Sequence, residues 1–133
     1  MKILVRYNGS TADKKALRLA KQYARVWNAK IEVVKSVEQS PRMGFQDIEE
    51  EEVKLDNEVK EILDADRDLY ETHLSLTNAS PGEDIVELAK AMEAKQIIIG
   101  IKRRSRTGKL IFGSNSQYII LNAHCPVVTV RHE

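Results

Sequence analysis

Two loops of this sequence are candidates for binding a ligand, and the second of them carries residues that suit a phosphate group. One loop, Asn8-Gly9-Ser10, follows a short apolar run, and the other spans Gly100 to Ser116. Glycines let a ligand approach the backbone closely, and hydroxyl and guanidinium groups donate hydrogen bonds to phosphate oxygens. A helix that begins near Asn115 adds unpaired N–H groups. The second loop combines all of these features in Gly100, Arg103, Gly113, Ser114, Asn115 and Ser116.

The same residues also have purely structural interpretations. Ser114 and Gln117 have the spacing of a capping box, in which the serine side chain accepts a hydrogen bond at the start of a helix. Gly113 also suits an ordinary turn, and the basic run at 102–109 suits a solvated surface loop. The residue types therefore make this loop a candidate site and leave its structural role open.

The sequence gives little support for other nucleotide motifs, a metal site or a catalytic nucleophile. Gly108-Lys109 is followed by Leu110, which does not match a P-loop, and no glycine-rich dinucleotide motif follows the first apolar run. The three histidines have no metal-ligand spacing with Cys125, and no nucleophile elbow is present. We therefore predict no catalytic residue and no metal site. This argues against an enzyme.

Length and composition indicate one globular domain over residues 1–133. Of the 133 residues, 42% are apolar and 31% are charged, which is ordinary for a protein with a hydrophobic core. The net charge of +1 points to no polyanionic partner. The charges are unevenly placed, with an acidic run at 47–58 and a basic run at 102–109. Nucleic acid is not the expected partner, because only Phe112 lies near the basic run for base stacking.

The single cysteine, Cys125, cannot form an internal disulfide, and we expect a buried structural thiol. The sequence begins with Met1 and Lys2 and enters an apolar run without a signal peptide. No apolar stretch is long enough for a membrane span. These features predict a protein of the reducing cytoplasm.

Hydrophobic periodicity predicts alternating strands and helices. The second helix should run from Asp47 to about Leu69, and Gly100 should end the fourth strand. Ser10 and Asp13 have capping-box spacing, Asn28 suits a left-handed helix end, and Ser80 begins a capped helix. The expected strands cover 3–7, 31–37, 70–77, 97–99 and 126–131, and the expected helices cover about 11–28, 47–69, 81–92 and 115–123.

This alternation favours an open parallel sheet with helices on both faces, as in Rossmann-like α/β folds. Ligands of such sheets bind beyond the carboxyl ends of the strands, where the strand order reverses. The loops after the first and fourth strands fit that place.

The C-terminal part of the chain resembles the universal stress protein family. The stretch Ile-Ile-Ile-Gly at 97–100, followed by Gly113-Ser114 and by Cys-Pro-Val-Val-Thr-Val at 125–130, matches the family's glycine pattern. The start Ile-Leu-Val-Arg-Tyr-Asn-Gly-Ser resembles the family's first strand, which ends in Asp-Gly-Ser. Ser-Pro-Gly-Glu-Asp-Ile at 80–85 resembles its third helix start. The resemblance covers the chain except roughly residues 38–68.

The resemblance implies a site for ATP or AMP, and it leaves open whether magnesium accompanies the nucleotide. Gly100, Gly113, Ser114 and Ser116 would cradle phosphates and ribose, while Asn8 and the backbone near Ser36 would meet the adenine. Two positions depart from the family pattern. Arg103 stands in place of the second glycine, where it either pairs with phosphate or obstructs its approach. Asn8 replaces an aspartate and can still hydrogen-bond an adenine edge without a charge.

A five-stranded sheet in the order 3-2-1-4-5 follows from this fold and places the first and fourth loops side by side. It also places the strand Pro126 to Arg131 at an apolar sheet edge, which invites pairing. The resemblance implies a homodimer through this strand. We therefore expect an ATP- or AMP-binding module for stress response or signalling, with a protein partner of unknown identity. The alternative is a dimeric interaction protein of the same fold that binds no nucleotide. The resemblance also leaves slow ATP hydrolysis open.

Overall fold

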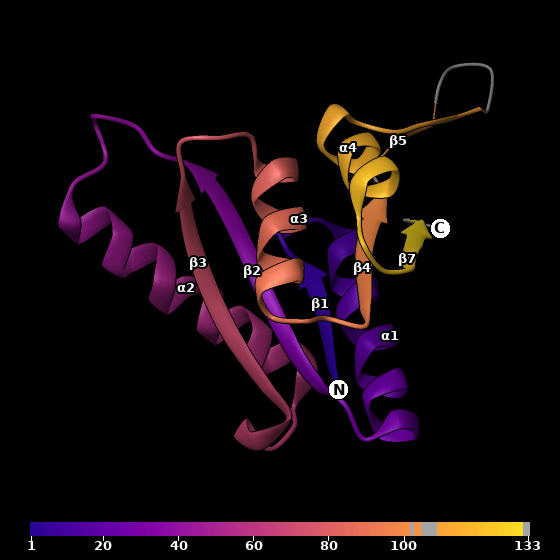
Figure 1. Cartoon of the computed structure of the whole chain (residues 1–133). Helices are drawn as coiled ribbons and strands as arrows, with labels where there is room; N and C mark the ends of the chain where they lie inside the picture. The colour runs from indigo at the N-terminus through magenta and orange to yellow at the C-terminus, as the bar shows by residue number, and fades with distance from the viewer. Residues whose placement is uncertain (102, 105–108, 132–133) are drawn as a thin grey trace.

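The computed structural model describes residues 1–101, 103–104 and 109–131 of the chain (Figure 1). Short runs rich in Val and Ile form four of the five strands of the main sheet, as expected for residues that pack well on a pleated surface. The strands are β1 (Lys2–Arg6), β2 (Lys30–Glu38), β3 (Tyr70–Thr77), β4 (Gln96–Ile101), β5 (Arg103–Arg104), β6 (Leu110–Ile111) and β7 (Val127–Arg131).

The first and third helices begin at serines whose side chains satisfy free backbone groups. The Ser10 hydroxyl accepts a hydrogen bond from the Asp13 N–H at 3.0 Å, and the helix ends at Asn28 in a left-handed conformation. Ser80 likewise accepts from the Glu83 N–H at 3.2 Å. These caps confirm the predicted boundaries. The helices are α1 (Thr11–Trp27), α2 (Phe45–Leu63), α3 (Pro81–Ala91) and α4 (Ser114–Asn122), with a 3₁₀ turn, η1, at Arg67–Leu69.

The second helix is shorter than its predicted range. α2 ends at Leu63 because Asp64 adopts a left-handed conformation, with φ of 42°, and its N–H caps the last turn. The predicted end at Leu69 was therefore wrong, and residues 67–69 form η1 instead. A narrow apolar stripe, Leu55, Val59 and Leu63, is buried, so the acidic residues of α2 occupy its outer faces.

The main sheet has the strand order β3-β2-β1-β4-β7, and all four pairings are parallel. This confirms the predicted order 3-2-1-4-5, with β7 as the fifth strand of the sheet. β1 lies beside both β2 and β4, so the strand order reverses next to β1 and the loops after β1 and β4 are neighbours. β7 forms one edge of the sheet, as expected.

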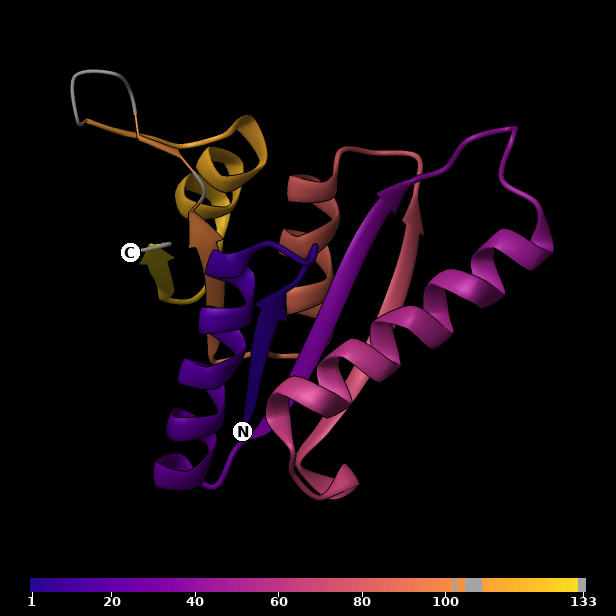
Figure 2. The same ribbon diagram turned by 180° about the vertical axis from the view of Figure 1, so that it is seen from behind.

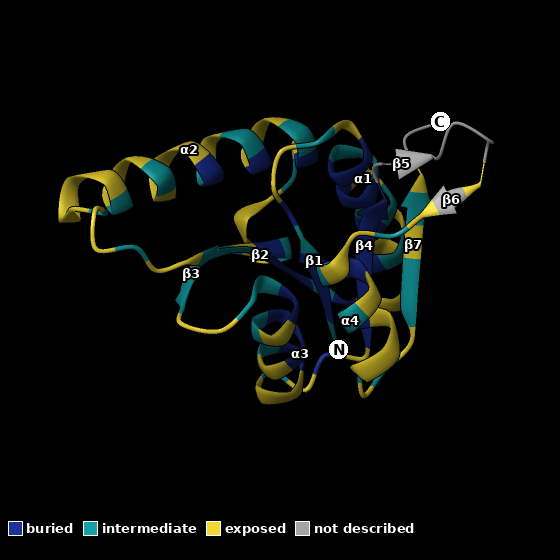
Figure 3. Cartoon of the chain, turned by 90° about the horizontal axis from the view of Figure 1, so that it is seen from above, coloured by how far each residue is buried: buried dark blue, intermediate teal, exposed yellow. Residues whose placement is uncertain are grey.

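Helices cover both faces of this sheet. α3 and α4 lie in front of the sheet in Figure 1, whereas α1 and α2 lie in front of it when it is seen from behind (Figure 2). Each layer encloses its own apolar cluster, one around Leu17 and Val59 and the other around Ile85 and Ile119. The central strands β1 and β4 are the most deeply buried elements, and the first turns of α2 are mostly exposed (Figure 3).

Two further expectations differ from the structure near the fourth strand. Gly100 does not end β4, because the strand continues to Ile101 and pairs there with β7. The segment predicted as a loop over 101–112 contains the short antiparallel pair β5 and β6. Most of the basic run, including Lys102 and Arg106, lies outside the described residues.

Cys125 is half-buried rather than buried, and partial burial still raises the pKa of its thiol. In the described part of the chain, no helix is long and apolar enough to cross a membrane.

Candidate functional site

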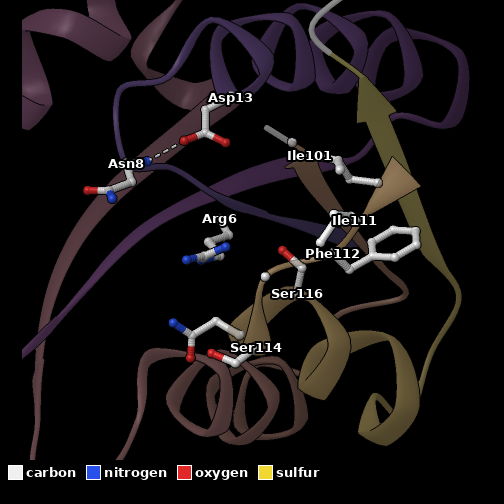
Figure 4. Close-up of a pocket in the computed structure, with 11 residues that line it drawn as sticks. Arg6, Asn8, Asp13, Ile101, Ile111, Phe112, Ser114 and Ser116 are labelled. Carbon is white, nitrogen blue, oxygen red and sulfur yellow. Dashed lines mark hydrogen bonds between the residues drawn. The ribbon is translucent and has the colours of Figure 1, made fainter. Parts of the chain in front are cut away.

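A cavity of about 360 Å³ lies beyond the carboxyl ends of β1 and β4. The loop after β1 lines one side of it, and the start of α4 lines the other (Figure 4). The cavity therefore occupies the place where the strand order reverses, which is where open α/β sheets bind ligands. Six of the predicted site residues line it: Asn8, Gly100, Gly113, Ser114, Asn115 and Ser116.

The start of α4 presents backbone N–H groups toward this cavity. Gly113 is the residue before the first turn, and its carbonyl accepts from the Gln117 N–H at 2.9 Å. Ser114 is the first helical residue and forms no side-chain cap, so the predicted capping box with Gln117 was wrong. Within the described residues, no side chain accepts a hydrogen bond from the first N–H groups of α4, and the positive end of the helix dipole faces the cavity.

A contact between two helix starts fixes the direction of α4. The Asn115 Oδ1 atom accepts a hydrogen bond of 3.0 Å from the Gly82 N–H in the first turn of α3. A Cβ atom at Gly82 would lie 2.9 Å from the Asn115 carbonyl oxygen, so the two helices meet closely only because residue 82 is glycine.

The opposite wall of the cavity is organised by the buried carboxylate of Asp13. Its Oδ2 atom accepts hydrogen bonds from the N–H groups of Asn8 at 2.8 Å and Ser10 at 3.4 Å. These bonds close the capping box and hold the Asn8-Gly9-Ser10 turn, in which Gly9 has a φ of +88°. Asp13 was predicted only as a cap, and the structure shows that it also lines the cavity.

The two predicted cradle glycines differ in their surroundings. A Cβ atom at Gly100 would lie 2.6 Å from Asp13 Oδ1 and 2.7 Å from the Ala12 carbonyl carbon, so this glycine lets α1 pack against β4. A Cβ atom at Gly113 would meet no atom within 4 Å, and the φ of −65° at this position suits any residue. Gly100 is therefore required by the fold, whereas the described contacts give no packing reason for Gly113.

Sequence reasoning overlooked Arg6, which is the last residue of β1 and lines the cavity. Burial lowers the pKa of its guanidinium, and the attraction of Asp13 offsets part of this effect. The available signal was a charged residue at the end of an otherwise apolar strand.

Ser116 is 6% exposed and lines the cavity from the first turn of α4. Within the described residues, its hydroxyl has no hydrogen-bond partner, and Figure 4 shows its oxygen directed toward the open space near Arg6. Together with the N–H groups of α4 and Arg6, it can donate hydrogen bonds to an anion.

Three other predicted site residues do not line the cavity. Gly9 and Ser10 form the turn beside it, where Ser10 serves as the cap of α1. Ser36, on β2, donates a hydrogen bond of 2.6 Å to Asp84 Oδ2. The backbone of Arg103 lies in β5, and its side chain is outside the described structure.

A second cluster of charged residues lies at the amino end of the sheet. The ligand atoms of Glu32, Glu71 and His73 are all within 4.8 Å of one another. Glu32 Oε2 lies 2.6 Å from His73 Nε2, and the two carboxylates also approach Lys2 Nζ at 3.9 Å and Lys30 Nζ at 3.2 Å. We call these five residues the amino-end cluster. The positive charges of the lysines already balance the carboxylates, and the cluster joins the three strands β1, β2 and β3, whose residues are far apart in sequence.

Comparisons with known proteins all indicate one family. The model of the universal stress protein family matches residues 1–131. A universal stress protein of Thermus aquaticus is 31% identical over 133 residues, covering 97% of each chain. Among solved structures, a universal stress protein from Archaeoglobus fulgidus has a TM-score of 0.83 and 35% identity, covering 98% of each chain. Another, from the same organism in complex with dAMP, has a TM-score of 0.78 and 30% identity and covers 98% of this chain and 97% of the other.

Proposed function

The chain belongs to the universal stress protein family, and we propose that it is an adenine-nucleotide-binding module for stress response or signalling. The proposed module comprises residues 1–133 as one domain and acts in the cytoplasm with Cys125 reduced. The observation that carries the proposal is the cavity at the strand-order reversal, where a helix start, the Ser116 hydroxyl and Arg6 face the same space. A similar universal stress protein has been solved with dAMP, which supports an adenine nucleotide as the ligand.

In the proposed arrangement, the phosphates lie over the segment Gly113 to Ser116. The N–H groups at the start of α4 and the hydroxyls of Ser114 and Ser116 donate hydrogen bonds to phosphate oxygens. The adenine lies near Asn8, toward the carboxyl end of β2 that carries Ser36. Two or three charge-assisted hydrogen bonds of about 1.5–3 kcal/mol each, reduced by the cost of association, suggest micromolar affinity for ATP or AMP.

Gly113 allows a direct test, because a side chain there enters open space. Gly113→Val should leave the unfolding temperature nearly unchanged and weaken ATP and AMP at least tenfold in calorimetry. Gly44→Val is the matched control, since Gly44 also precedes a helix in extended backbone conformation, at the start of α2. Titrations with and without magnesium would show whether the ion accompanies the nucleotide.

The wild-type result decides between the two functions considered. Heat with ATP, ADP or AMP, or nucleotide released when purified protein is denatured, would support the proposal. The absence of both at millimolar ligand would contradict it and favour a dimeric interaction protein that binds no nucleotide.

We further propose a homodimer through the edge strand, residues Pro126 to Arg131. β7 pairs with β4 on one side only, and Thr129 is exposed on this strand. An open edge strand with valines on both sides of Thr129 favours pairing with a second copy. Sedimentation at micromolar concentration should give a dimer for wild type and Thr129→Val, and a weaker dimer for Thr129→Asp. A wild-type monomer would contradict this assembly.

A further inference from the structure

Arg6 occupies an unusual position for a charged residue. It ends β1, a strand whose preceding residues Ile3, Leu4 and Val5 are fully buried. Side chains alternate across a strand, so Arg6 points to the same face as Leu4, which belongs to the cluster between the sheet and helices α3 and α4. Figure 4 shows its side chain between Asn8 and the first turn of α4, where Ser114 lies.

The charge of Arg6 has no close partner in the described structure. Asp13 is the one carboxylate among the described residues that line the cavity, and its Oδ2 atom already accepts the N–H groups of Asn8 and Ser10. The attraction between Asp13 and Arg6 is electrostatic, without an ion pair or a hydrogen bond. Asn8 is neutral, and Asn115 Oδ1 is bonded to the Gly82 N–H.

Partial burial makes this unpaired charge costly for the fold, because it removes water without supplying an acceptor. Around the same space, the start of α4 and the unpartnered Ser116 hydroxyl offer further donors. A cavity whose described residues offer several donors and one cation without an ion-pair partner is complementary to an anion.

We propose that Arg6 determines the specificity of this cavity by binding the anionic group of its ligand. The cavity then selects adenine nucleotides over the uncharged nucleoside. This inference rests on the proposed function and adds that Arg6, at the end of β1, supplies the charge that recognises phosphate. It makes Arg6 a ligand-binding residue whose cost to the free protein is offset when the anion is bound.

Calorimetry with AMP and adenosine tests this assignment in wild type and in Arg6→Met, which keeps an unbranched apolar stem and removes the charge. Arg6→Met should weaken AMP about 10- to 100-fold, as expected for the loss of a charge-assisted hydrogen bond, and leave adenosine within about twofold. Arg6→Lys should recover part of the AMP affinity. Arg25→Met, on the exposed surface of α1, is the matched control and should change neither affinity.

Thermal unfolding without ligand provides a second readout. Because Arg6 has no close partner in the part of the chain that the structure describes, Arg6→Met should unfold at the wild-type temperature or above it. An unfolding temperature well below wild type would show that Arg6 supports the fold, and it would overturn the proposal. Equal loss of AMP and adenosine affinity would also overturn it, because Arg6 would then contact the nucleoside.

Pyrophosphate separates failure of this inference from failure of the proposed function. AMP binding that is unchanged in Arg6→Met would leave nucleotide binding intact and overturn the role of Arg6. Pyrophosphate binding that is lost in Arg6→Met would support the anion site even if adenine is not the base recognised. A wild-type protein that binds neither AMP nor pyrophosphate at millimolar concentration would overturn both proposals.

Discussion

The two ends of the sheet differ in whether a buried charge has an ion-pair partner among the described residues. At the amino end, the Glu32 carboxylate is 2% exposed and lies beside His73 and Lys2. At the carboxyl end, Arg6 is partly buried beside a cavity and has no ion-pair partner in the described structure. The charges of the amino-end cluster are paired with one another, whereas among the described residues Arg6 forms no ion pair with Asp13, the one carboxylate that lines the cavity. A paired buried charge indicates a structural role, and an unpaired one beside a cavity indicates a place for a ligand.

The largest expected effect on stability comes from a substitution that disturbs close packing at the cavity end. If packing rather than charge pairing stabilises this end, Gly100→Ala should lower the free energy of unfolding by about 2–3 kcal/mol, because the new Cβ would overlap Asp13 and the backbone of Ala12. Chemical denaturation measures the loss. Gly113→Ala is the control and should change stability by less than about 0.5 kcal/mol. A stable Gly100→Ala protein would mean that α1 can move away from β4.

Removal of the buried carboxylate tests the amino end. Glu32→Gln should lower the free energy of unfolding by about 2 kcal/mol, because His73 and Lys2 lose the negative charge that they share. Nucleotide affinity should not change, since the cluster lies at the far end of the sheet. Glu71→Gln is the control, because Glu71 is 55% exposed and should matter less. If Glu32→Gln were as stable as wild type, the paired charge at Glu32 would not stabilise the fold, and it would no longer differ from Arg6 in this respect.

The smallest expected effect on stability comes from an exposed ion pair, that of Arg67 with Asp56. A hydrogen bond of 2.7 Å from Arg67 is the main cause that lowers the pKa of Asp56 from its ordinary value of 3.8. Since the folded-state pKa is depressed, this pair stabilises the fold above pH 3.8, and the effect is lost as pH falls through the folded-state pKa. Asp56→Asn should cost about 0.5 kcal/mol at pH 7, since the pair is exposed.

Denaturation curves measured from pH 7 to pH 3 check this sign. The difference between Asp56→Asn and wild type should shrink as the pH falls, whereas Glu50→Gln, at an exposed position of α2, should show little effect at any pH. A difference that grows in acid would contradict the pairing with Arg67.

Much of the fold followed from local sequence signals. Alternating apolar runs and helix caps such as Ser10 and Ser80 predicted the order of elements, because each signal acts within a few residues. The end of α2 was missed because a left-handed Asp64 has no strong local signature. The continuation of β4 through Gly100 was missed because β7 and α1, which pair with and pack against it, come from distant parts of the chain.

The candidate site was predicted only in part, because some of its residues are brought together by contacts between distant parts of the chain. Gly113, Ser114 and Ser116 lie close together in sequence and were predicted together. The helix cap was wrongly assigned to Ser114, because Gly113 is the residue before the first turn. The sequence pattern of β1, a mostly apolar strand, did not indicate a function for Arg6. Only the packing of α4 beside the end of β1 places Arg6 and Ser116 around one cavity.

The sequence by itself determined the alternation of strands and helices, and with it a parallel sheet whose carboxyl end carries the glycine- and serine-containing loops. The tertiary structure alone decided which charges are paired. Pairing depends on atoms that approach within a few ångströms across strands and helices distant in sequence, as for Glu32 with His73, 41 residues apart. Among the described residues, the same long-range packing left Arg6 without such a partner, because the helix start that faces it carries hydrogen-bond donors and no carboxylate.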